Sequence, residues 1–172
     1  MIYSVRTYPD PVLKKKAEVV TSFDAELAVI VDNMFETMYH ARGVGLAAPQ
    51  VGILKQLCVM DPNSGDENLD AEPVVLINPV LVRGEGEIHY EEGCLSVPGH
   101  YAEVTRFEEI SVQAHTLLGE LRQFEFKGFA AIVCQHEMDH LHGKLFIDRI
   151  GSSERDLIKR RVRKAQKEKT SV

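Results

Sequence analysis

The chain has no tryptophan and only three cysteines among its 172 residues. Cys58, Cys94 and Cys134 are an odd, scattered set, which argues against a disulfide framework and indicates thiols that are reduced, buried or bound to metal. No apolar run is long enough to cross a membrane. The first twenty residues show neither the apolar stretch of a secretory signal nor a transit-peptide pattern, so we expect a cytoplasmic protein.

Basic residues are concentrated at the C-terminal end of the chain. Residues 149–172 contain nine Lys or Arg and three Asp or Glu, although the whole chain has a net charge of −6. We therefore expect one compact domain over residues 1–150, with residues 151–172 forming a basic helix or tail. Such a tail favours phosphate-rich partners, but it is also typical of a frayed, solvated terminal helix that has no partner. It has no aromatic residues for base stacking, so we expect no sequence-specific nucleic-acid binding.

Two histidines, His136 and His140, lie four residues apart in the segment Gln135–His140. On a helix they share one face and can ligate a single ion. Glu137 is offset from that face, so it can reach a metal-bound water without being a ligand. The pattern indicates metal-activated hydrolysis, although the same pattern also occurs in helices whose histidines only pack in the core or lie at the surface.

A helix through these histidines is supported by the residues on either side of them. Phe129, Ile132 and Val133 continue the histidine stripe upstream with helical spacing, so the histidines should face inward. Gly143 is typical of the position just past a helix C-terminus. The sequence therefore predicts a helix of roughly four turns.

A catalytic metal site needs a third protein donor, and Cys94 is the best candidate. It lies in the segment Glu91–Gly99, where glycine and proline residues predict a bend that exposes the thiol. Cys58 lies in an apolar strand and is most simply a core residue. Cys134 precedes His136 by two residues, which puts it on nearly the opposite face of the helix.

The segment Gly43–Gly52 is rich in small residues, which allow close approach of a ligand to the backbone. Gln50 adds a neutral amide at its end. Such a loop can bind an extended peptide, but a pair of closely spaced glycines also often marks only a tight bend.

The elements expected along the chain give an α+β fold. Apolar residues from Leu27 to Met38 have helical spacing and predict an N-terminal helix that follows the possible caps Thr21, Ser22 and Asp24 and ends near Gly43. Four segments are rich in Val, Ile, Leu and Phe and predict strands: Gln56–Met60, Val74–Val82, Glu103–His115 and Glu120–Phe126. Residues 116–119 separate the last two and suit a hairpin turn, in which Gly119 can take a positive φ. We expect antiparallel or mixed sheets packed around the central metal-bearing helix, with the N-terminal helix and a C-terminal basic helix beside them.

Taken together, three segments closely resemble the signature motifs of the peptide deformylases. They match in order and spacing: Gly43–Gln50, Glu92–Ser96 and Gln135–Gly143. The resemblance extends to Tyr8–Leu13 and to the chain length, and it covers the sequence up to about Ile150. It implies that residues 1–150 are a catalytic deformylase domain, and the basic tail is similar to that of bacterial members.

The resemblance also implies roles for individual residues. Cys94, His136 and His140 would be the metal ligands, and Glu137 the catalytic acid and base. Three groups would contact the reacting formyl peptide: the Gln50 amide and the Leu95 N–H at the oxyanion, and the backbone of Gly45 along the substrate. The remaining positions would surround the methionine side chain: Val44, Glu92, Leu95, Phe129, Ile132 and Val133. The chain departs from many members at Tyr101, where they have arginine.

The implied reaction is removal of the N-formyl group from the initiator methionine of nascent chains. The implied cofactor is one divalent metal, Fe(II) in the native state, although His and Cys ligands also accept Zn, Ni and Co. One alternative is a zinc endopeptidase, but such enzymes take a downstream Glu or His as third ligand, and the residues after His140 are mainly basic. The other is a ribosome- or nucleic-acid-binding module with a structural metal, which would normally need four protein ligands. Ribosome contact through the basic tail is compatible with the enzyme as well.

Overall fold

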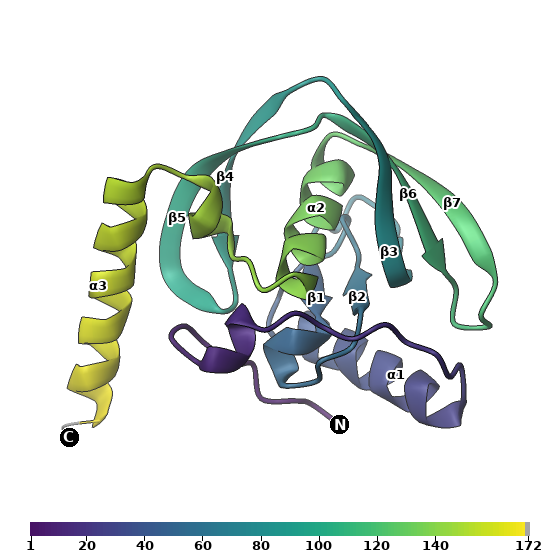
Figure 1. The fold of residues 1–172 in the computed structure, drawn as a ribbon, viewed down its shortest axis with the longest axis horizontal. Coiled ribbons are helices and arrows are strands. Elements are labelled where there is room, and N and C mark those ends of the chain that lie inside the picture. Colours follow the sequence, from purple (N-terminus) through teal and green to yellow (C-terminus); the bar gives the residue numbers. More distant parts are fainter. Residues whose placement is uncertain (171–172) are drawn as a thin grey trace.

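The structure, a computed structural model, describes residues 1–170 and has the α+β architecture expected from the sequence. Its centre is the helix α2 (Phe129–Leu141), which lies between two antiparallel sheets (Figure 1). One sheet has the strand order β1-β2-β3-β6-β7 and the other is the hairpin β4-β5. The strands are β1 (Gly45–Ala47), β2 (Leu57–Met60), β3 (Val74–Glu85), β4 (Ile88–Cys94), β5 (Val97–Arg106), β6 (Glu109–His115) and β7 (Leu121–Lys127).

The helices begin and end close to the positions that the sequence predicts. In α1 (Ala25–His40) the Asp24 side chain caps the N-terminus by accepting a hydrogen bond from the Leu27 N–H, and the apolar stripe packs against β1 and β2. The helix α2 ends two residues before Gly143, whose φ of +74° suits glycine. Three short 3₁₀ helices complete the set: η1 (Pro11–Lys14), η2 (Ala48–Val51) and η3 (Phe146–Arg149).

The strand predicted over Glu103–His115 is wrong as a single element. The chain leaves the two-stranded sheet after Arg106 and enters the five-stranded sheet at Glu109. At the crossing, the Gln135 side chain accepts from the Phe107 N–H at 3.1 Å and donates to the Phe107 carbonyl at 2.9 Å. A helix side chain therefore replaces the neighbouring strand at this point, which local sequence does not reveal. The hairpin turn predicted between β6 and β7 is present, with Gly119 at a φ of +82°.

Strand β4 was not predicted, because most of its residues are polar and three in a row, His89 to Glu91, are exposed. It pairs with β5, and Cys94 lies opposite Val97 at the tip of the hairpin. Leu95 and Ser96 form the two-residue turn between them, so the bend predicted around Cys94 is a tight hairpin turn.

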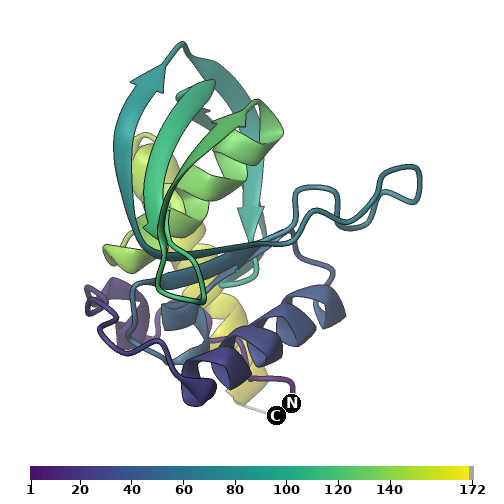
Figure 2. The same cartoon turned by 90° about the vertical axis from the view of Figure 1, so that its right-hand side faces the viewer.

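The basic segment forms α3 (Ser152–Thr170), which packs beside η3 at the edge of the molecule (Figures 1 and 2). Ile158 and Val162 are its buried residues, and they join a core cluster with Tyr8 and Phe146. The last two residues of the predicted tail, 171–172, lie outside the described part of the chain. None of the helices over residues 1–170 combines the length and apolar character that crossing a membrane requires.

Candidate metal centre and its cleft

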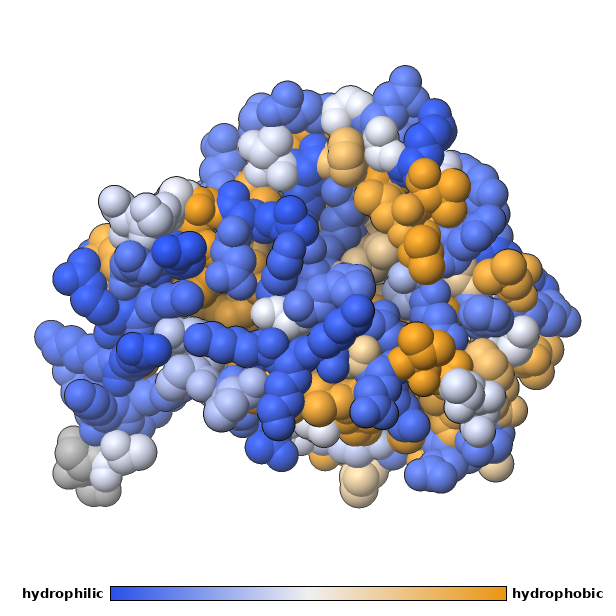
Figure 3. Space-filling model, viewed as in Figure 1, coloured by the Kyte–Doolittle hydropathy of each residue, from blue (hydrophilic) through white to orange (hydrophobic). Residues whose placement is uncertain are grey.

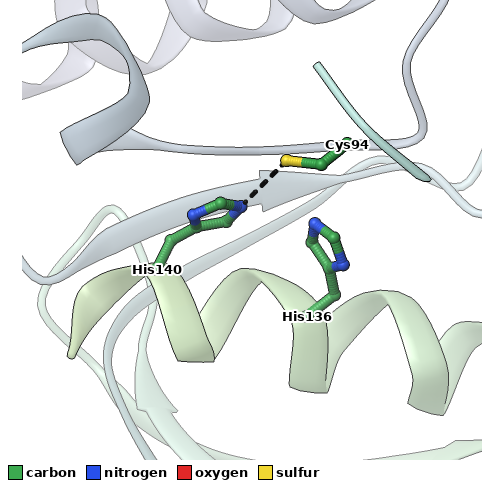
Figure 4. Close-up of side chains that lie close together, drawn as sticks. All are labelled: Cys94, His136 and His140. Atoms are coloured by element: carbon green, nitrogen blue, oxygen red, sulfur yellow. Dashed lines mark hydrogen bonds between the residues drawn. The ribbon is translucent and has the colours of Figure 1, made fainter. Parts of the chain in front are cut away.

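The three predicted metal donors lie together. The Nε2 atom of His140 is 3.5 Å from the Sγ atom of Cys94, and one donor atom from each of Cys94, His136 and His140 lies within 4.8 Å of the others. Figure 4 shows both imidazoles rising from α2 toward the thiol at the hairpin tip. Donors that share a tetrahedral ion with bonds of about 2.0–2.3 Å are about 3.5 Å apart, so this arrangement fits one metal ion with an open fourth position.

The imidazole of His136 is oriented by a buried carboxylate. Its Nδ1 atom lies 2.8 Å from Oε1 of Glu92, so the Nε2 atom is left for the ion. Burial tends to raise the pKa of Glu92, but hydrogen bonds from His136 and Arg106 outweigh it and hold that pKa below its usual value. Glu92 is therefore an ionised acceptor that fixes the histidine ring.

Arg106 links the hairpin to α2 through two carboxylates. Its Nε and Nη2 atoms donate to Glu92 at 2.6 and 2.9 Å, and its Nη1 atom donates to Asp139 at 2.9 Å. Asp139 also accepts two hydrogen bonds from Arg149. These contacts make Asp139 a buried carboxylate that holds two arginine side chains, rather than a solvated carboxylate on the helix surface.

Glu137 lies beside the donor cluster and is buried. Its Oε2 atom has no hydrogen-bond partner among residues 1–170. In the protein alone, burial raises its pKa to about 7, while the charges of His136 and Arg106 oppose the shift. A Cβ atom at position 45 would lie 2.6 Å from Oε1 of Glu137, so this carboxylate requires glycine there. The arrangement gives a carboxyl group that can exchange a proton near neutral pH.

Gln50 connects the glycine-rich segment with the hairpin turn. Its Oε1 atom accepts from the Ala47 N–H at 2.9 Å, and its Nε2 atom donates to Ser96 Oγ at 3.1 Å and lies 3.7 Å from Cys94 Sγ. The amide is 1% exposed and its N–H₂ group points toward the donor cluster. It is thus a neutral donor held by backbone and side-chain contacts on two elements.

Strand β1 lies at the edge of its sheet, beside the cluster. The Val44 carbonyl faces β2, where it accepts from the Asp61 N–H, whereas the Ala47 N–H faces the Gln50 side chain. Since backbone groups alternate along a strand, those of Gly45 face the open edge. An extended peptide can add to that edge.

A cleft of about 620 Å³ opens over the cluster. The predicted site residues Gly45, Gln50, Cys94, His136 and Glu137 line it, whereas His140 is 1% exposed and lies behind them. The residues predicted for the methionine pocket all line the same cleft: Val44, Glu92, Leu95, Phe129, Ile132 and Val133. Tyr101 lines it too, packed so closely over Gly93 that a Cβ there would lie 2.6 Å from the ring. The cleft therefore offers a mainly apolar pocket next to the metal donors.

Sequence reasoning missed Arg106, Arg149 and Ser96. A signal for Arg106 was present, because Ala102, Val104 and Arg106 alternate along one strand and all three are buried. A charged residue at an inward-facing position indicates a buried ion pair. Arg149 and Ser96 have no comparable local signal.

Comparison with known proteins gives consistent matches. The model of the family described as polypeptide deformylase matches residues 2–156. A peptide deformylase from Acidobacterium capsulatum is 50% identical over 167 residues, 97% of each chain, and one from Thermotoga maritima is 44% identical over 94% of each. The crystal structure of a peptide deformylase from Legionella pneumophila has a TM-score of 0.90, 39% identity, and coverage of 99% of this chain and 98% of that one. The chain, as its three motifs predict, belongs to the polypeptide deformylase family.

Proposed function

We propose that the protein is a metal-dependent hydrolase that removes the N-formyl group from N-formylmethionine of nascent polypeptides and releases formate. The observation that carries this proposal is the Cys94–His136–His140 cluster beside Glu137 in a cleft, in a chain of the deformylase family. An endopeptidase of the H-E-x-x-H type is not favoured, because the third donor is a cysteine from a hairpin. A purely structural metal is not favoured either, since the cluster found in residues 1–170 has three donors.

In this proposal Cys94, His136 and His140 hold one divalent ion. When bound, the ion supplies a Lewis acid and brings the pKa of a water molecule toward neutrality. Glu137 accepts a proton from the attacking water and delivers it to the amine nitrogen as the C–N bond of the formyl group breaks. The protein thus uses one carboxyl group for both proton transfers.

Negative charge on the formyl oxygen would be met by neutral donors of the protein. We assign this role to the Gln50 amide and the Leu95 N–H, because Gln50 points toward the donors and Leu95 forms the turn next to Cys94. The loss of one such donor typically costs about 10² to 10³ in kcat. The peptide chain would add to the β1 edge at Gly45, with the methionine side chain in the pocket formed by the six residues named for it above.

The test of this function is formate release from a formyl-Met tripeptide by metal-loaded protein. An internal peptide substrate of the same length serves as the control for endopeptidase activity. We expect formate and a free N-terminus from the first substrate and no cleavage of the second. Absence of formate release from protein with a full complement of metal would contradict the proposal.

We further propose Fe(II) as the native ion. A thiolate with two imidazoles accepts Fe, Zn, Ni and Co, so the choice of iron comes from the resemblance to the deformylases. A thiolate bound to ferrous iron forms a centre that air oxidises, which makes the choice testable. We expect iron in protein purified without oxygen, and a loss of activity in air that substitution by Ni(II) prevents. Metal analysis of the anaerobic protein checks this, and a preparation that is fully active with zinc and contains no iron would contradict it.

The basic helix α3 is a candidate ribosome-binding element, appended to a catalytic unit formed by residues 1–150. Ile158 and Val162 pack on the body, whereas Arg160, Arg161 and Lys164 are exposed. The hydrophilic surface over this helix is visible in Figure 3. An exposed cationic face attracts the phosphates of RNA without reading sequence, and the contact would deliver the enzyme to emerging chains.

Ribosome binding can be tested without disturbing the core. We expect the triple variant Arg160→Gln, Arg161→Gln, Lys164→Gln to lose co-sedimentation with ribosomes at low salt. The control is Lys14→Gln, Lys15→Gln, Lys16→Gln, which removes the same charge from another exposed segment. Equal co-sedimentation of the two variants would show that α3 has no special role.

A further inference from the structure

The N-terminal segment contacts two loops of the candidate site, namely the loop formed by η2, which contains Gln50, and the turn of the β4-β5 hairpin, which contains Ser96. The Arg6 N–H donates to the main-chain carbonyl of Gln50 at 2.7 Å, and the Tyr8 N–H donates to the main-chain carbonyl of Ser96 at 2.8 Å. Residues 1–7 belong to no helix or strand themselves and run as an extended segment along this side of the molecule (Figure 1, purple). Two backbone bonds, two residues apart, therefore tie one short segment to both loops.

The two loops belong to different structural units. Gln50 lies in η2, which follows the edge strand of the five-stranded sheet, whereas Ser96 lies in the turn of the separate β4-β5 hairpin. No strand pairing joins these sheets within residues 1–170. The polar contacts between the Gln50 side chain and the hairpin turn are its hydrogen bond to Ser96 and its approach to Cys94, and Leu95 of the turn packs against the core cluster that includes Ala48 and Val51 of η2. The position of the Gln50 amide relative to Cys94 thus depends on these contacts and on the N-terminal segment.

The segment is itself firmly held. Tyr8 is 2% exposed, and its ring packs in a core cluster with Leu13, Phe146 and Ile158. The Lys159 and Arg163 side chains of α3 lie over the same ring, 5.6 and 5.5 Å from its centre. Gln166 donates a hydrogen bond to the Tyr8 carbonyl. A segment anchored in this way can fix the distance between the loops that it joins.

We propose that residues 6–8 are a brace that positions the side-chain amide of Gln50 against the hairpin turn next to Cys94, with Arg6 acting as a positioning residue through its backbone N–H. The proposal rests on the role of Gln50 in the proposed function. The Arg6 side chain is not needed for it, since the bond to Gln50 comes from the main chain. Loss of the brace shifts Gln50 and leaves the cleft and the donors in place.

Arg6→Pro tests the brace because proline has no N–H, and Arg6→Ala is the control that keeps this donor. We expect Arg6→Pro to lower kcat about 10- to 100-fold, with KM and metal content within threefold of the wild type, because misplacing a reacting group by about 1 Å has an effect of this size. In a Gln50→Ala background the same change should cost less than threefold, because the group that it positions is already absent. Arg6→Ala should match the wild type.

A second measurement does not depend on activity. The Ala47 N–H donates to Gln50 Oε1, so the rate of hydrogen exchange of the Ala47 N–H reports whether the Gln50 side chain is held in place. We expect the Ala47 N–H to exchange at least tenfold faster in Arg6→Pro than in Arg6→Ala, with both proteins free of metal. If Arg6→Pro does not fold, Tyr8→Ala removes the anchoring ring, and Tyr8→Phe is its control because the hydroxyl has no partner in residues 1–170.

An unchanged kcat in Arg6→Pro, or an equal loss in the Gln50→Ala background, would overturn the brace. Unchanged Ala47 exchange would overturn it as well. Failure of the wild-type protein to release formate would instead contradict the proposed function. The hydrogen exchange of Ala47 would then be the remaining test of the brace.

Discussion

Replacing Arg106 by methionine removes a guanidinium group that holds two buried carboxylates. Arg106 donates two hydrogen bonds to Glu92 and one to Asp139, and the side chains of Arg106 and Glu92 are 4% and 3% exposed. Methionine has similar length and fills the space without the charge. The change therefore leaves Glu92 with His136 as its remaining partner, while Asp139 keeps Arg149.

The cost follows from leaving a buried charge uncompensated. Removing one member of a buried ion pair typically destabilises a protein by about 3–5 kcal/mol. For a chain of this size each kcal/mol lowers Tm by about 2–4 °C, so we expect Tm to fall by roughly 6–20 °C. Because Glu92 orients His136, we also expect metal affinity to fall by about 10- to 100-fold, as found for residues that hold metal ligands in place.

Thermal unfolding followed by circular dichroism and metal titration measures both effects. The matched control is Arg83→Met, because Arg83 is exposed and forms an ion pair with exposed Glu85, so its loss should cost less than about 1 kcal/mol. A fall in Tm no larger than that of the control would refute the view that Arg106 compensates buried charge. Unchanged metal affinity would refute the proposed orientation of His136 through Glu92.

The remaining predictions concern Glu137, Gly45 and the metal. Glu137→Ala should keep its metal and lose formate release, and full turnover with metal bound would contradict its assigned role. Gly45→Ala should lower kcat about 10²-fold, because its Cβ would displace the Glu137 carboxylate, whereas Gly151→Ala, where nothing lies within 4 Å, should not; equal kcat values would refute this. Removing the metal with a chelator should lower Tm, since an ion present at 1,000 times its Kd stabilises the folded state by about 4 kcal/mol; calorimetry with and without chelator checks it.

The donor cluster was predictable because two of its members lie on one helix. The spacing of His136 and His140 fixes their relative position once α2 forms, and the apolar stripe shows that α2 forms. Cys94 came from elimination among three cysteines and from glycine and proline in its neighbourhood. The same local rules located α1, with Asp24 among its three possible caps, and the turn at Gly119.

The supports of the cluster could not be predicted in this way, because they depend on contacts between residues far apart in sequence. The bond from Arg106 to Asp139 spans 33 residues and that from the Arg6 N–H to the Gln50 carbonyl spans 44. The break after Arg106 was missed for the same reason, since the Gln135 side chain that bonds Phe107 lies 28 residues away. Local propensity favours a continuous strand there, and a tertiary contact overrides it.

The Arg106 network and the metal join the same two elements. Glu92, Cys94 and Arg106 belong to the hairpin, whereas His136, Asp139 and His140 belong to α2. Since the Arg106 bonds also orient His136 through Glu92, their loss should weaken metal binding and so reduce the stabilisation that the ion gives to the folded state. At the same metal concentration, chelation should therefore lower the Tm of Arg106→Met by less than it lowers the Tm of Arg83→Met, because a 10- to 100-fold weaker affinity removes about 1.4 to 2.7 kcal/mol of the stabilisation by the ion. An equal fall in the two variants would mean that ion pairs and metal stabilise separate parts of the molecule.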